Sequence, residues 1–104
     1  MTPMHISVAG YDVALNPQTR AYAEYRVFST LARHADQIDA VRVVVAAAPP
    51  GASDDAVCVI EVDLRSGDAV RAKERASHSY SAVDSAAESI FEMMQRRGRD
   101  AVST

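Results

Sequence analysis

The sequence has little of what secreted, membrane-spanning or disulfide-stabilised proteins need. Its only cysteine is Cys58, so no disulfide can form within the chain. No apolar run approaches the roughly 20 residues that span a bilayer. The opening stretch, MTPMHISVAG, lacks the cationic start and apolar run of a secretory signal. These absences favour a cytoplasmic protein, in which Cys58 is a small core residue rather than a reactive thiol.

The motifs of common catalytic sites are also missing. The sequence contains no P-loop, no G-x-G-x-x-G, no H-E-x-x-H and no nucleophile elbow. His5, His34 and His78 lie far apart and fall on different predicted elements. No histidine or second cysteine stands at metal-ligand spacing from Cys58. We therefore expect no enzyme activity, no metal and no cofactor.

A general excess of positive charge is absent as well. The 104 residues carry 11 Lys and Arg against 14 Asp and Glu, a formal net charge of −3. This balance argues against a protein that coats nucleic acid through its overall charge. Any nucleic-acid contact must come from a local cluster of cations, because phosphate attraction follows local charge as well as the total. The length fits a single domain over residues 1–104.

Apolar periodicity predicts four strands and two helices in the order β-α-β-β-β-α. The strands are expected at 4–9, 41–48, 56–64 and 69–75, and the helices from 17 to about 34 and from 80 to 97. Asn16 and Pro17 are good start signals for the first helix. Gly98 is expected to break the last helix and leave 98–104 as a flexible tail. This order predicts an α+β two-layer sandwich, a four-stranded sheet with both helices packed on one face.

The same patterns predict which residues face the core. In the first helix, one apolar stripe is expected to consist of Ala21, Tyr22, Tyr25, Phe28, Leu31 and Ala32. We interpret Tyr22 and Tyr25 as core residues rather than platforms for stacking bases, and Arg20, Arg26 and Arg33 as a solvated helix face. In the strand at 56–64, Val57 and Val59 share the solvent side with Glu61 and Asp63.

Two clusters of cations stand out near the carboxyl end. Arg71, Lys73 and Arg75 alternate along one strand and therefore share one face, and we call them the basic row. The last helix ends in Arg96, Arg97 and Arg99. Each cluster also has a structural interpretation: charged strand residues discourage edge pairing, and arginines at a helix end complement its dipole.

Several short motifs resemble those of the ribosome hibernation-promoting factor family, also called ribosome-associated inhibitors or sigma-factor modulation proteins. The resemblance rests on Gly67, Asp68 and Ala72, and on the segment from His78 to Asp84, HSYSAVD. It extends to the first strand and glycine, HISVAG, and to the runs RHADQI and VRVVV. The expected member is a short form, without the second domain that pairs ribosomes in longer members.

This resemblance implies binding to small-subunit rRNA in the mRNA and tRNA channel, so that an idle ribosome is blocked without catalysis. It assigns rRNA contacts to Arg71, Lys73, Arg75, Arg96, Arg97 and Arg99. No DNA and no membrane partner is expected. The chain departs from the family pattern at Glu74, which is expected to neutralise part of the basic row. It departs again at His78, which stands at the helix cap and leaves Ser77 or Ser79 to satisfy the first free amides.

The alternative is a protein-interaction module that kept the fold and lost the ribosome. Its motivation is the acidic balance, the replacement of family cations by Ser89 and Glu92, and the apolar Val57 and Val59 on the expected solvent face. Such a protein would self-associate or capture another protein through the sheet face.

Overall fold

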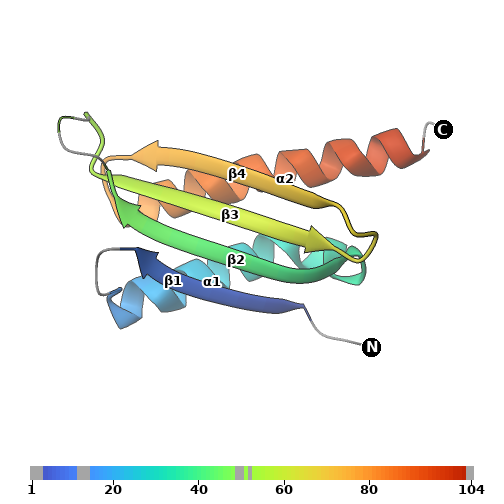
Figure 1. Cartoon of the computed structure of the whole chain (residues 1–104), viewed down its shortest axis with the longest axis horizontal. Helices are drawn as coiled ribbons and strands as arrows, with labels where there is room; N and C mark the ends of the chain where they lie inside the picture. Colours follow the sequence, from blue (N-terminus) through green and yellow to red (C-terminus); the bar gives the residue numbers. More distant parts are fainter. Residues whose placement is uncertain (1–3, 12–14, 49–50, 52, 103–104) are drawn as a thin grey trace.

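A computed structural model describes residues 4–11, 15–48, 51 and 53–102. The elements are β1 (His5–Tyr11), α1 (Pro17–Leu31), the 3-10 helix η1 (Ala32–Gln37), β2 (Ile38–Ala47), β3 (Ala56–Leu64), β4 (Ala69–Ala76) and α2 (Ser79–Val102). They form a two-layer α+β sandwich, with both helices on one side of the sheet and the other side open (Figure 1). The predicted fold class and element order are confirmed.

The four strands lie in the order β1-β2-β3-β4. β1 pairs with β2 in parallel, as the α1 crossover allows, and the other neighbours pair antiparallel. β4 is therefore an edge strand, and α2 packs beneath it. A tight turn joins β3 to β4 at Gly67, whose φ of 98° is a conformation that glycine adopts without steric cost. This arrangement leaves β4 with one free edge and one open face.

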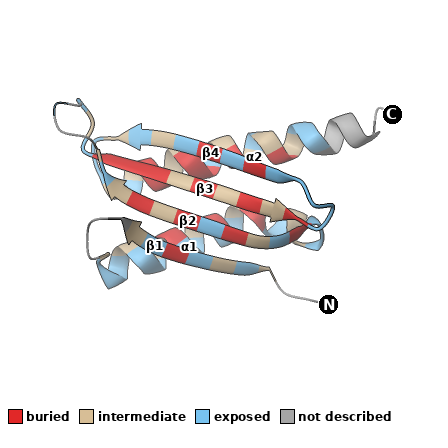
Figure 2. Cartoon of the chain, in the orientation of Figure 1, coloured by how far each residue is buried: buried red, intermediate tan, exposed pale blue. Residues whose placement is uncertain are grey.

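The core lies between the sheet and the helices, as the red bands in Figure 2 show. Strand β3 supplies fully buried Cys58, Ile60 and Val62 to this layer. From α2, Val83 and Ile90 are also fully buried. Two layers of aliphatic side chains thus close on each other, and burying them is the main favourable contribution to folding.

The predicted face of α1 is wrong in part: Leu31 is fully buried and Tyr22 packs against the core as expected, but two other residues do not. Tyr25 and Phe28, expected in the core, are 70% and 54% exposed, and the buried positions are Ala23, Val27 and Leu31. These three residues recur at intervals of four and make a narrower stripe, which shares Leu31 with the predicted one and is turned away from Tyr25 and Phe28. The helix starts as predicted, because the Asn16 side chain accepts a hydrogen bond of 2.7 Å from the Gln18 amide.

Three predicted boundaries also change. The first helix ends at Leu31 and continues as η1, and β2 begins at Ile38 instead of the expected position 41. The predicted break at Gly98 is wrong, because α2 continues to Val102. A single glycine costs a helix only about 1 kcal/mol relative to alanine, and no proline follows it here. Of the loop between β2 and β3, residues 49–50 and 52 lie outside the described part.

The amino end of α2 is capped differently from the prediction. The His78 ring nitrogen Nδ1 accepts from the Ser81 amide at 3.4 Å, so the histidine itself takes the capping place expected of Ser77 or Ser79. Tyr80, in the first turn of α2, is 38% exposed and packs edge-on against Tyr22, with ring centroids 4.7 Å apart. None of the described helices is both long and apolar enough to cross a membrane.

Candidate nucleic-acid interface

The open face of the sheet brings the basic row beside β3. Cross-strand neighbours on this face are Arg71 with Glu61, Lys73 with Val59, and Arg75 with Val57. Side chains directly opposite each other in an antiparallel pair lie within reach of one another. The strand alternation predicted this shared face correctly, but the identity of each neighbour depends on strand register and was not predicted. The three cations consequently have different surroundings.

One half of the open face is a network of ion pairs. Arg42 of β2 contacts Glu61 at 3.0 Å and Asp63 at 2.7 Å, and Arg71 contacts the other Glu61 oxygen at 3.4 Å. The pKa of Arg42 is raised above its already high ordinary value, most strongly by the hydrogen bond to Asp63 and next by the hydrogen bond to Glu61. All four side chains are partly exposed, so each pair contributes little to folding. We call these four residues the charge network. Within it, Glu61 compensates part of the positive charge of Arg71.

The other half of the open face is an apolar hollow with a cationic wall. Its volume is about 290 Å³, and its lining includes Val44, Val59, Lys73 and Arg75. Within the described part of the chain, no carboxylate lies at ion-pair distance from Lys73 or Arg75. These two cations are therefore the members of the basic row that are available to an external anion. We call this feature the sheet hollow.

Glu74 does not neutralise the basic row as predicted. It lies on the helix-covered side of β4, where its Oε1 accepts a hydrogen bond of 2.7 Å from the Ser89 hydroxyl of α2. The two departures from the family pattern at positions 74 and 89 therefore contact each other. Together they link β4 to α2 by a polar contact instead of diluting the charge of the open face.

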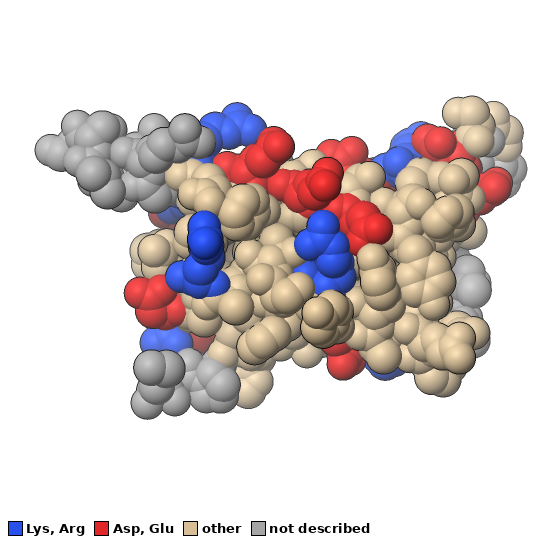
Figure 3. Space-filling model, turned by 180° about the vertical axis from the view of Figure 1, so that it is seen from behind, with Lys and Arg blue, Asp and Glu red and all other residues tan. Residues whose placement is uncertain are grey.

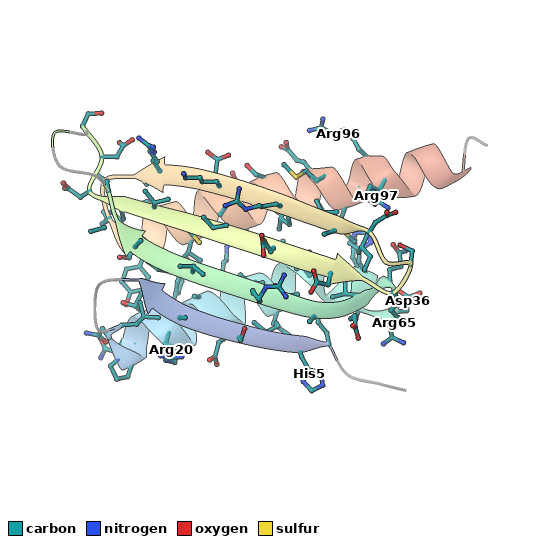
Figure 4. All side chains as sticks on the ribbon, in the orientation of Figure 1. His5, Arg20, Asp36, Arg65, Arg96 and Arg97 are labelled. Atoms are coloured by element: carbon teal, nitrogen blue, oxygen red, sulfur yellow. The ribbon has the colours of Figure 1, made fainter. Side chains whose placement is uncertain are left out.

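The arginines of α2 lie in the helix layer, beside the free edge of β4. Arg97 contacts Asp68, in the turn before β4, at 2.9 Å, and Arg96 is 3.9 Å from Glu92 on its own helix. Figure 4 labels both residues at this end of the molecule. The backbone of Arg99 is helical, and its side chain lies outside the described part. The structure thus separates these residues from the basic row, with the edge of the sheet between them.

The helix layer carries the opposite charge pattern. Asp84, Glu88 and Glu92 recur every four residues along α2, so they share one face of that helix. Acidic side chains cross this side of the molecule in Figure 3. A groove of about 470 Å³ between α1 and α2 is lined by residues that include Arg26, Arg33 and Glu88. Of its two cations, Arg26 is paired with Asp84 at 3.2 Å, and Arg33 lies 6.0 Å from the centroid of the Phe91 ring.

Arg26, expected to be solvated, joins the two helices. Its Nε donates to Asp84 at 3.2 Å, and the Tyr22 hydroxyl donates to the same carboxylate oxygen at 2.5 Å. The hydrogen bond to the Asp84 carboxylate favours the neutral phenol and raises the pKa of Tyr22. Arg20 is also engaged, since its guanidinium donates to the Val8 carbonyl oxygen of β1 (Figure 4). Both arginines thus have structural roles that the helix periodicity did not indicate.

Comparison with known families matches residues 6–100 to the family described as sigma 54 modulation protein / S30EA ribosomal protein. The match spans almost the whole chain. The chain belongs to this family. The resemblance found in the sequence is thereby confirmed, and the chain is a member of a ribosome-associated family.

Solved structures of similar fold carry related descriptions. The N-terminal domain of Thermus thermophilus Protein Y superposes with a TM-score of 0.71 at 24% identity, covering 91% of this chain and 98% of that one. A ribosomal subunit interface protein from Coxiella burnetii superposes with a TM-score of 0.70 at 16% identity, covering 92% and 99%. No curated protein sequence matches the chain. At these identities the two structures support the fold of this S30EA family member.

Proposed function

We propose that this protein is a cytoplasmic translation inhibitor of the hibernation type, which binds small-subunit rRNA in the channel for mRNA and tRNA. Membership of a ribosome-associated family supports the choice of partner. The observation that carries the proposal is the pair Lys73 and Arg75, which face solvent on the open sheet with no carboxylate of the described residues to compensate them. The protein inhibits by occupying the channel, and no bond is made or broken.

Phosphate oxygens are the expected ligands of the basic row. Binding a phosphate requires a cation at the right place and carries no sequence information, which suits a site made of lysine and arginine alone. Arg71 contributes after it exchanges Glu61 for a phosphate. Arg96, Arg97 and Arg99 form a second line of contacts on the other side of the β4 edge, where Arg97 first leaves Asp68.

Sedimentation with ribosomes on a sucrose gradient tests this proposal. The wild-type protein is expected to migrate with the small subunit or the whole ribosome at low salt and to dissociate as salt rises, because phosphate contacts release counterions. Arg75→Glu is expected to weaken this binding at least tenfold, whereas Arg33→Glu serves as a control with the same charge change on the helix layer. Equal losses for the two variants would mean that total charge, and not the open face, governs binding.

A second candidate function is a protein-interaction module of the same fold that has lost ribosome binding. Half-buried Val44 and Val59 on the open face favour it, as do exposed Tyr25 and Phe28 on α1. Self-association through the sheet face would then be visible by light scattering. A monomer that captures ribosomal subunits and no other protein eliminates this candidate.

A further inference from the structure

The sheet hollow combines two features that a phosphate site alone does not need. Its wall on the β4 side carries Lys73 and Arg75, and its floor is aliphatic, with Val44 and Val59 half-buried and Val57 only 7% exposed. No acidic residue lines it. A complementary ligand therefore has an anionic group joined to a flat or apolar part.

The strand register determines how the aliphatic floor and the two cations are arranged relative to each other. Val59 is paired on one side with Val44 and on the other with Lys73, so the apolar floor and the cation occupy one row across β2, β3 and β4. Arg75 lies two residues farther along β4, roughly 7 Å away. Both cations can therefore reach a single anionic group placed at the β4 side of the floor.

The charge network limits the direction in which such a ligand can extend. Glu61 occupies the next row beyond Val59 on this face and Asp63 the row after it, and carboxylates at these places disfavour a nearby phosphate. An anionic chain on this face consequently keeps away from Glu61 and Asp63, and it reaches Arg71 only where Arg71 exchanges Glu61 for a phosphate. It passes along β4 and leaves the sheet at the Arg75 end.

We propose that the sheet hollow holds one unpaired nucleotide of a single-stranded RNA segment, with its base on Val44 and Val59 and its phosphate between Lys73 and Arg75. This inference rests on the proposed function, which makes RNA the partner, and it specifies which part of the RNA is bound. Unpaired nucleotides expose a base face that apolar side chains can cover, whereas a duplex keeps its base faces stacked inside and offers only phosphates to the rim.

The size and charge of the hollow favour this occupant over a protein. At about 290 Å³ it lies just below the usual range of small-ligand pockets, which suits one nucleotide. A protein surface large enough for a stable complex would have to cover the hollow and the neighbouring charge network together. It would also bury Lys73 and Arg75, which is costly without partners of opposite charge.

Fluorescence anisotropy with the whole protein tests the inference, using a short labelled oligoadenylate alone and annealed to oligouridylate. The single strand is expected to bind about tenfold more tightly than the duplex. Val59→Thr keeps the β-branched shape and adds a hydroxyl to the floor, so single-strand binding should weaken about threefold to tenfold. The slope of log K against log salt should not change, because no cation is lost.

Two control variants distinguish the contribution of the apolar floor to binding from that of the cationic wall. Ala40→Thr adds a hydroxyl to the same sheet face outside the hollow and should leave binding unchanged. Lys73→Gln should reduce the salt slope by about 0.7, the value for one contact to a single strand. A bound base is indicated when Val59→Thr weakens binding without changing the salt slope and Lys73→Gln reduces the salt slope.

Other outcomes overturn the inference. Equal binding of single strand and duplex, with no effect of Val59→Thr on affinity, would mean that the hollow binds phosphates only. The proposed function would still be supported in that case if ribosome binding is salt-sensitive and is weakened by Arg75→Glu. Displacement of the oligonucleotide by adenosine monophosphate at equal concentration would mean that the ligand is a free nucleotide. Loss of a dimer in Val59→Thr, without RNA binding by the wild type, would assign the hollow to protein.

Discussion

Along β3, consecutive residues fall alternately on the helix-covered face and on the open face of the sheet. Cys58, Ile60 and Val62 on the covered face are fully buried, whereas Val59 and Glu61 on the open face are half-buried. The covered face is apolar throughout β3, and the open face mixes valines with charged side chains. Residues that stabilise the fold and residues available for binding are therefore separated by a single step along one strand, and substitutions can test them independently.

The largest difference between the two faces is expected in thiol reactivity. Cys58 in the folded protein should react with a thiol reagent more slowly, by a factor of about a thousand or more, than a cysteine placed on the open face by Val59→Cys in a Cys58→Ala background. Reaction at Cys58 requires an opening that exposes the core, with a free energy near that of global unfolding. Similar rates for the two cysteines at neutral pH would contradict the burial of this position.

Cys58 also gives the covered face a dependence on pH. Burial raises the pKa of its thiol to about 12, against about 8.5 in an unfolded chain. The neutral thiol is favoured in the folded state, so its contribution to stability is complete below about pH 8.5 and is lost as the pH rises toward 12. Urea unfolding from pH 8 to 11 should show a decline in stability that is smaller in Cys58→Ala.

The next largest effect concerns the free energy of unfolding. Ile60→Ala should reduce it by about 2–5 kcal/mol, because it leaves a cavity between the sheet and the helices. Val59→Ala, one residue away on the open face, should reduce it by less than about 1 kcal/mol. Urea denaturation monitored by circular dichroism measures both values. Equal losses would mean that the open face is covered in solution.

Much of this comparison was accessible from the sequence, because alternation along a strand needs no knowledge of its neighbours. The bounds of β3 agree with the prediction, and the basic row lies on the side opposite Val70 and Ala72, which are buried. The Asn16 cap was also predicted, since it depends on local chemistry. Strand patterns and short-range signals thus carried the fold.

The predictions that failed concern features that depend on contacts between elements. In α1, Tyr25 and Phe28 form an apolar stripe of their own, and periodicity cannot decide whether the sheet covers that stripe or the one through Val27. The pairing of Arg71 with Glu61 follows from the β3–β4 register, which the sequence did not specify. The sheet hollow was missed for the same reason. Half-exposed valines next to alternating cations were its one signal.

The smallest expected effect compares the two groups of candidate RNA contacts. Glu61→Gln removes the carboxylate that engages Arg71, and Asp68→Asn removes the one that engages Arg97. Each substitution removes one negative charge, so the two variants have the same net charge. If both groups contact rRNA, each variant should bind small subunits about twofold to fourfold more tightly at low salt, as measured by pelleting titrations. A gain in Glu61→Gln alone would restrict the interface to the open face.

The central claim is that the open sheet face and the adjoining edge of β4, and not the outer face of α1, meet the ribosome. An iron chelate that cleaves nearby RNA tests it most directly when tethered to single cysteines in a Cys58→Ala background. Ala69→Cys places the probe on the open face outside the sheet hollow, and Ser29→Cys places it on α1 in the helix layer. We expect rRNA of the mRNA and tRNA channel to be cleaved strongly from position 69 and weakly from position 29. Stronger cleavage from position 29 would contradict the account and place the ribosome against the helices.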